Sequence, residues 1–147
     1  NVGDQSYVYQ EAQNTIAQFG QKMLDLAQDS LTRRDLQGAL DIVNKIPPIA
    51  KLQREAEDFE VIANAQAKAW SGTVADLEAA IAQIQKVEIG RPLYAKAQTL
   101  LGRWQSEKGD IAQIEKARQL AQSGNPKDLQ AAISQASLVK RKNSPAT

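Results

Sequence analysis

Apolar residues recur along most of the chain at alternating spacings of three and four residues. That spacing keeps one face of a helix apolar over several turns. In the first run the positions are Tyr9, Ala12, Ile16, Phe19, Met23, Leu26 and Ser30. The later runs have Leu36, Leu40, Val43 and Ile46, then Ile49, Leu52, Ala56, Phe59, Ala63, Gln66 and Trp70, then Val74, Leu77, Ile81, Ile84 and Val87, then Leu93, Ala97, Leu100, Trp104, Ile111 and Ile114, and finally Leu129, Ile133, Ala136 and Val139. No stretch alternates with period two, so the pattern predicts an all-α fold.

Turn signals separate these runs into about six helices. Thr32 is expected to cap the second helix, and Pro47-Pro48 ends it because proline cannot donate to the helical ladder. Ser71-Gly72-Thr73 and Gly90-Arg91-Pro92 mark two further stops and restarts. In Ser123-Gly124-Asn125-Pro126, the glycine closes one helix, the asparagine caps the next and the proline takes its first position. Residues 92–123 favour one long helix, although Lys108-Gly109-Asp110 leaves two shorter helices open.

A six-residue phrase occurs three times, at residues 35–40, 76–81 and 128–133, and reads Asp-Leu-(Gln/Glu)-(Ala/Gly)-Ala-(Leu/Ile). Spacings of roughly 40–50 residues are typical of stacked helix pairs. We therefore expect one domain over residues 1–147, built from three antiparallel helical hairpins near residues 5–48, 49–91 and 92–140, with a tail at 141–147. A repeat stack is favoured, and an elongated bundle of coiled-coil hairpins stays open because the stripes have heptad spacing.

The third unit carries a resemblance to a known group of proteins. Its phrases are Pro-Leu-Tyr-x-x-Ala-Gln-x-Leu-Leu-x-x-Trp (92–104), Ala-x-x-x-Ala-x-x-Gly (117–124) and Asp-Leu-x-x-Ala-Ile-x-x-Ala (128–136). These resemble repeats in cyanobacterial proteins labelled as similar to chromosome-segregation ATPases. The resemblance implies a membrane-tethered protein whose helical-repeat region is soluble, with no established activity. Tetratricopeptide-type repeats are a weaker likeness.

The composition limits the kinds of catalytic and metal-binding sites that the chain can form. The chain has no cysteine and no histidine, which removes thiolate metal sites, the commonest general base and the commonest zinc ligand. No Gly-x-x-x-x-Gly-Lys-Ser/Thr loop is present to bind nucleotide phosphates. Acidic residues such as Glu55, Glu57, Asp58 and Glu60 are interpreted as a solvated helix face. We therefore expect no enzyme activity, no cofactor, no metal and no small-molecule substrate.

Three aromatic residues are candidates for binding a partner protein. Trp70 and Trp104 could anchor a partner, because tryptophan is enriched in binding hot spots, although their heptad positions favour core packing. Tyr7 has no assigned place in the pattern and is kept as a third candidate. Tyr9 and Tyr94 are interpreted as packing residues near helix starts.

Two basic clusters are candidates for contact with anions, namely Arg33-Arg34 and Lys140-Arg141-Lys142. The net charge is only +1, so no overall field attracts nucleic acid or an anionic membrane. Solvated chain segments are the simpler interpretation of both clusters, and we do not expect nucleic acid to be a partner.

The function we expect is a non-enzymatic interaction, scaffold or spacer module of a membrane-associated or cell-envelope protein, whose partner is another protein or a second copy. A weak nucleic-acid or anionic-lipid binder is the alternative. The chain begins at Asn1 and not at methionine, so we expect a processed protein or a fragment. A membrane contact is expected only through a segment absent from this sequence.

Overall fold

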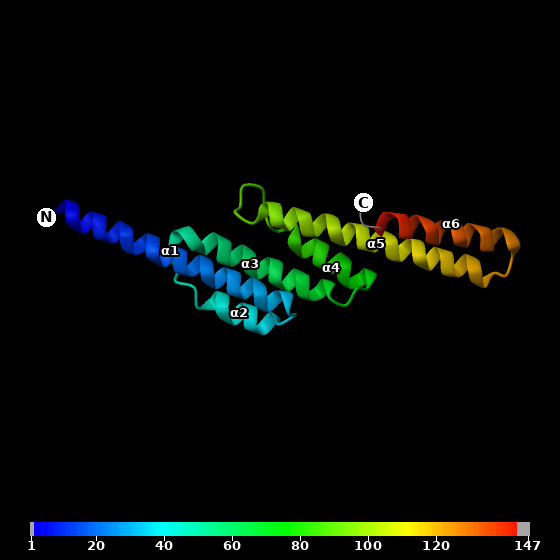
Figure 1. Cartoon of the computed structure of the whole chain (residues 1–147), viewed down its shortest axis with the longest axis horizontal. Helices are drawn as coiled ribbons and strands as arrows, with labels where there is room; N and C mark the ends of the chain where they lie inside the picture. The colour runs from blue at the N-terminus through cyan, green and yellow to red at the C-terminus, as the bar shows by residue number, and fades with distance from the viewer. Residues whose placement is uncertain (1, 144–147) are drawn as a thin grey trace.

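The computed structural model describes residues 2–143, which form six helices and no strand. The predicted all-α fold is confirmed, and residues 92–123 hold one long helix (Figure 1). The helices are α1 (Val2–Thr32), α2 (Leu36–Asn44), α3 (Ala50–Ala69), α4 (Val74–Ile84), α5 (Tyr94–Gln122) and α6 (Pro126–Asn143).

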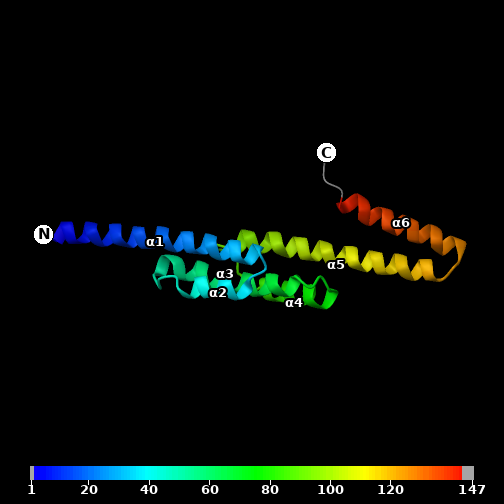
Figure 2. The ribbon, with the colours of Figure 1, turned by 60° about the horizontal axis from the view of Figure 1, so that its bottom comes forward.

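Consecutive helices pair as three hairpins, α1–α2, α3–α4 and α5–α6. The second hairpin packs on the first because α3 contacts both α1 and α2, whereas the third reaches the second mainly through contacts between α4 and α5. Figures 1 and 2 show a staggered, elongated array, in which α6 lies along the far half of α5. The first two hairpins therefore match the predicted stack, and the third extends it lengthwise.

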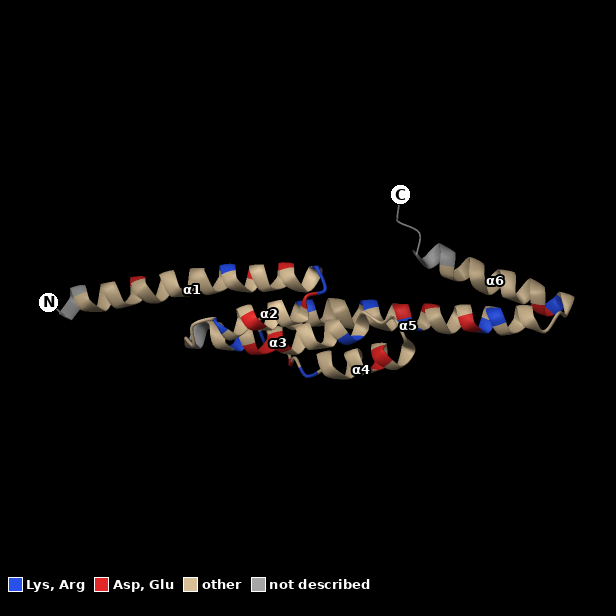
Figure 3. Cartoon of the chain, turned by 90° about the horizontal axis from the view of Figure 1, so that it is seen from below, with Lys and Arg blue, Asp and Glu red and all other residues tan. Residues whose placement is uncertain are grey.

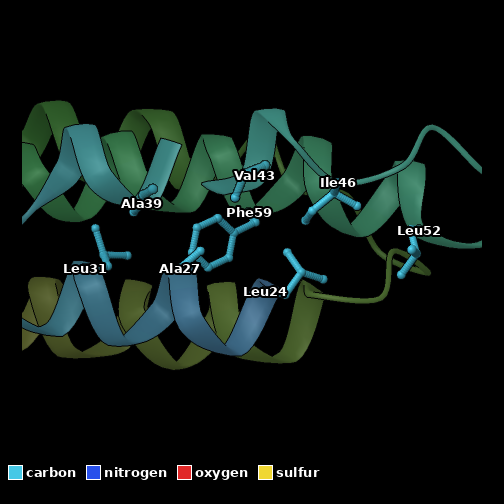
Figure 4. Packing of buried hydrophobic residues seen from close by; sticks show 9 residues of the cluster. Leu24, Ala27, Leu31, Ala39, Val43, Ile46, Leu52 and Phe59 are labelled. Atoms are coloured by element: carbon cyan, nitrogen blue, oxygen red, sulfur yellow. The ribbon is translucent and has the colours of Figure 1, made fainter. Parts of the chain in front are cut away.

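The first hydrophobic core lies between α1, α2 and α3. Figure 4 shows the Phe59 ring of α3 between Ala27 of α1 and Val43 of α2. The small side chain of Ala27, which is fully buried, leaves room for this ring. The other buried members are Leu24, Leu31, Ala39, Ile46, Leu52 and Ala63.

The second core lies between α3, α4 and α5, and α3 contributes Ile62 and Ala65 to it. Ile62 and Ala65 lie on one face of α3, and Phe59 and Ala63 lie on another. The long helix of the middle hairpin is thus buried on two sides. The buried residues from the other helices are Leu77, Ala80, Ile84, Val87, Ala97, Leu100 and Trp104.

The apolar face predicted for α1 is wrong in one respect. Phe19 and Leu26, expected inside, are 59% and 57% exposed, and Tyr9 is 66% exposed. The buried face instead runs through Ala17, Gly20, Leu24, Ala27 and Leu31. Small residues line it because α1 approaches its neighbours closely, so the larger apolar side chains remain on an adjacent face.

Gly20 packs closely against Leu52 of α3. A Cβ atom added at this position would lie 2.1 Å from Cδ1 of Leu52, a residue that is only 2% exposed. A glycine within a helix costs about 1 kcal/mol relative to alanine. The close contact with α3 explains why glycine stands here.

The turns inside the second and third hairpins have the same hydrogen-bond pattern. The hydroxyl groups of Ser71 and Ser123 donate to Asp76 and Asp128 at 2.6 and 2.7 Å, where these aspartates open α4 and α6. Gly72 and Gly124 adopt φ values of 71° and 70° just before the N-cap residues, as predicted. The repeated phrase thus corresponds to a repeated local structure. The caps themselves are Thr73 and Asn125, whose side chains accept from the N–H groups of Asp76 and Lys127.

The turn of the first hairpin differs from this pattern. Thr32 is the last residue of α1 and not the predicted cap of α2. The cap is Asp35, whose carboxylate accepts from the N–H of Gly38 at 2.9 Å. Pro92 lies before α5, which begins two residues later than expected, and α6 continues to Asn143, beyond the predicted boundary at 140.

An ion pair fixes the segment between α4 and α5 to α3. Arg91 donates to both carboxylate oxygens of Asp58, at 2.9 Å from Nε and 3.0 Å from Nη2, and also reaches Glu57 at 3.4 Å. The side chain of Asp58 is only 8% exposed, in contrast to the solvated face expected for it. The hydrogen bonds to Asp58 raise the pKa of Arg91, and the contact with Glu57 adds to this rise.

We predict that Gly20→Ala destabilises the protein relative to Gly102→Ala, because Gly102 has open space around it. Gly102→Ala should gain about 1 kcal/mol in free energy of unfolding from helix propensity. In Gly20→Ala, overpacking against Leu52 should cancel this gain and lower the free energy of unfolding by about 1 kcal/mol relative to wild type. Urea denaturation measures both. In a Leu52→Ala background, Gly20→Ala should become stabilising, and a penalty that persists there would contradict the assigned contact.

We predict that Arg91→Ala lowers the free energy of unfolding several times more than Arg118→Ala. The first change leaves the buried carboxylate of Asp58 without its charged partner, whereas Arg118 forms an exposed pair with Glu115 three residues away on the same helix. Thermal denaturation followed by circular dichroism compares the two. Equal losses would show that the Asp58 pair contributes no more than a surface contact.

Candidate functional site

A groove crosses three helices where the C-terminal ends of α1 and α3 meet the first half of α5. It consists of two hollows of about 350 and 440 Å³, which share a common set of lining residues. We call this surface the basic groove, because three of its four charged lining side chains are cations. The shared residues are Arg34, Gln66, Trp70, Leu100 and Arg103.

Arg34 occupies an unusual backbone conformation at the edge of the basic groove. Its φ is 61°, the only positive value among the described residues other than glycine. It ends α1 in a turn where its N–H donates to Leu31 O at 2.9 Å and the N–H of Asp35 donates to Ser30 O at 2.9 Å. A left-handed conformation costs about 1 kcal/mol or more for a residue with a side chain.

Glycine stands at the equivalent place in both other hairpins. Gly72 precedes the cap of α4 and Gly124 precedes the cap of α6, each with a φ near that of Arg34. The first hairpin therefore keeps a strained arginine where its own repeats use an unstrained glycine. Backbone strain of this kind is concentrated at functional positions. Because the arginine side chain lines the basic groove, we connect the strain with this surface.

The two tryptophans predicted as partner anchors meet in this groove. Trp104 of α5 is 4% exposed and belongs to the second core, as its heptad position suggested. Trp70, just after α3, is half-buried and packs against the first core. Both also line the first hollow beside Arg34 and Arg103. The structure thus brings together three residues that the sequence assigned to two different kinds of contact.

Lys96 lies at the other end of the groove and is partly withdrawn from water. Its ammonium group donates to Oε1 of Gln28 and stands 5.8 Å from the ring centroid of Phe59. Burial lowers the pKa of Lys96, because desolvation disfavours the charged form. An anion bound nearby would offset this penalty.

Two polar groups complete the groove lining. Oε1 of Gln66 is buried and accepts no hydrogen bond within the described residues. Glu107 is the single acidic side chain of the lining. The accessible part of the groove therefore offers cations for an anionic ligand.

Lys96, Arg103 and Gln66 were not among the site residues predicted from the sequence. A signal was present, because Lys96, Leu100, Arg103 and Glu107 follow spacings of four, three and four residues. That spacing places them on one face of α5, next to the face of Trp104. The pattern could not show that this face meets the end of α1, because that contact depends on the packing of hairpins.

The other predicted residues lie elsewhere. Tyr7 is 67% exposed on α1, far along the chain from the groove. The guanidinium of Arg33 donates to Oγ of Ser30 at 3.3 Å, and this residue is absent from the groove lining. Lys140, Arg141 and Lys142 belong to α6 by their backbone, but their side chains lie outside the described residues.

Within 2–143, no group of three or more metal-ligating side chains is found. Among the helices of the same part of the chain, none is long and apolar enough to cross a membrane.

In comparisons with known proteins, no family model, no curated protein and no solved structure matches this chain. The likeness to cyanobacterial repeat proteins therefore stays a prediction from the sequence. The site has to be interpreted from its own residues.

We predict that Arg34→Gly raises the free energy of unfolding by about 1 kcal/mol, because glycine adopts φ values near 60° without strain. Arg33→Gly is the matched control, since it removes the same charge one residue earlier, where φ is not positive. Urea denaturation of both variants measures the difference. If Arg34→Gly destabilises the protein as much as Arg33→Gly, strain at Arg34 is not significant.

Proposed function

We propose that this chain is a non-enzymatic interaction module that binds an acidic segment of a partner protein in the basic groove. The observation that carries the proposal is the strained Arg34, retained where the other hairpins use glycine. A residue kept at a cost in stability is expected to contribute to binding.

The charges of the groove favour a carboxylate-bearing ligand. Arg34, Lys96 and Arg103 line it with only Glu107 to oppose them. Arginine binds carboxylates through two parallel hydrogen bonds, which gives geometric specificity as well as energy. The whole chain carries a net charge of only +1, so the attraction is local to this surface.

The remaining groups favour a peptide over a simple anion. Trp70 adds apolar contact area to the groove, and tryptophan and arginine are both enriched in binding hot spots. The two hollows are continuous, so an extended segment of several residues fits them.

A scaffold or spacer role in a membrane-associated or cell-envelope protein agrees with the elongated shape, but the location rests on the sequence resemblance alone. Phosphate groups could also use the cations of the groove. Nucleic acid and anionic lipid therefore enter the experiment as alternative ligands.

We predict that the protein binds a labelled peptide rich in Asp and Glu, and not a Lys-rich peptide of equal length. Fluorescence anisotropy measures the affinity, which should fall with added salt. Arg34→Gly should weaken binding about tenfold, the value of one charge-assisted hydrogen-bond pair.

Arg33→Gly is again the control, because it removes an equal charge outside the groove and should leave the affinity nearly unchanged. Equal losses in both variants would indicate general charge attraction and contradict a defined site. Tighter binding to DNA or to phosphatidylserine vesicles than to the acidic peptide would replace the proposed ligand class.

A further inference from the structure

The exposed face of α1 is a second surface with its own pattern. It carries Tyr9, Ala12, Ile16, Phe19, Met23 and Leu26, spaced three and four residues apart in strict alternation. Tyr9, Phe19 and Leu26 are each more than half exposed, and Ile16 and Met23 are half-buried. We call this set the α1 stripe. It is turned by about a quarter of the helix circumference from the face that packs on α3.

The first turns of α1 have no support from the rest of the molecule. Residues 5–12 are exposed on every side, and Figures 1 and 2 show this part of α1 projecting beyond α2 and α3. A helical segment of this length without tertiary contacts is marginal in water. The side chains of Tyr7, Val8 and Tyr9 make this segment markedly apolar, with 62–67% of each exposed.

We propose that the α1 stripe pairs antiparallel with the same stripe of a second copy of this chain. The six positions are symmetric about the midpoint between Ala17 and Gln18, so the stripe matches itself when one copy is reversed. Ile16 then faces Phe19 of the second copy. In the same register Ala12 faces Met23 and Tyr9 faces Leu26, so the small side chain lies opposite a long one.

The antiparallel direction also suits the shape of the molecule. The projecting first half of one α1 lies along the supported second half of the other, which covers both exposed segments. The remaining helices of the two copies then extend toward opposite ends of the α1 pair. A parallel pair would instead bring them side by side.

Figure 3 shows few charged residues on the first half of α1. In the antiparallel pair Lys22 lies within about one helical turn of Glu11 on the second copy, but Asp25 lies nearer to the same Glu11. The antiparallel direction therefore rests on the symmetry of the α1 stripe and on the shape of the molecule, and not on charge.

The area is sufficient for a specific dimer. Each exposed aromatic side chain offers on the order of 100 Å² or more, and the whole stripe covers roughly 500 Å² on each copy. The total of about 1,000 Å² reaches the lower limit for a specific interface. The helix α6 also exposes apolar residues, Leu129 and Ile133, but this stripe is shorter. It is therefore a weaker candidate than the α1 stripe for contact with a second copy.

The first test measures mass in solution by light scattering at about 100 μM. Wild type should have the mass of two chains and Phe19→Glu the mass of one, with circular dichroism showing that the supported helices persist. Ile89→Glu is the control, because Ile89 is 81% exposed outside α1, and this variant should remain a dimer. A wild-type monomer, a dimer that survives Phe19→Glu, or a mass that grows beyond two chains would each overturn the proposal.

The second test fixes the direction, and it uses the absence of cysteine from the sequence. A Tyr9→Cys chain mixed with a Leu26→Cys chain should form a disulfide-linked heterodimer under mild oxidation. Neither chain should link to itself, since identical positions lie about 25 Å apart in the antiparallel pair. Self-linking of each chain without the mixed product would show parallel pairing and overturn the register.

Discussion

Burial of α3 on two sides is the constraint on which the rest of the array depends. Phe59 fills the space between α1 and α2, while Ile62, three residues later, is fully buried against the helices of the next core. One helix therefore belongs to both hydrophobic cores. Among the described helices, α3 alone contributes buried residues to both clusters. The first hairpin also meets α5 directly, where Lys96 donates to Gln28.

The basic groove is a consequence of this arrangement. The C-terminal ends of α1 and α3 are brought to the same place on α5, and Arg34, Trp70 and Arg103 come from three different helices or their ends. A binding surface assembled in this way depends on correct packing of all three hairpins. Leu31, Leu100 and Trp104 line the groove and also belong to the buried cores, whereas its charged residues lie outside them.

Much of the local structure was predictable from sequence, because helices, glycine C-caps and N-caps follow from short-range chemistry. Gly72 and Gly124 were correctly placed at the ends of helices, where both adopt a positive φ. The buried face of α1 was not, since the prediction followed the three-and-four spacing of apolar residues through Phe19, whereas the buried face runs through Gly20. Which face is inside depends on how near α3 approaches, and that distance is a tertiary property.

The candidate site was predictable only in part. Arg34, Trp70 and Trp104 were selected one by one from residue type, but nothing in their spacing indicates that they share a groove. Lys96 and Arg103 were missed because a single lysine or arginine on a helix is usually solvated. The positive φ of Arg34 could not be foreseen either, because glycine is the residue expected there.

The most direct test of the central claim uses the two indole N–H signals, since the sequence contains two tryptophans. In a ¹H–¹⁵N spectrum titrated with the acidic peptide, both signals should shift together, with the same saturation point. The backbone signals of Ile133 and Leu138 on α6 should stay in place. Unchanged indole signals during saturable binding would contradict the assignment of the basic groove as the binding site.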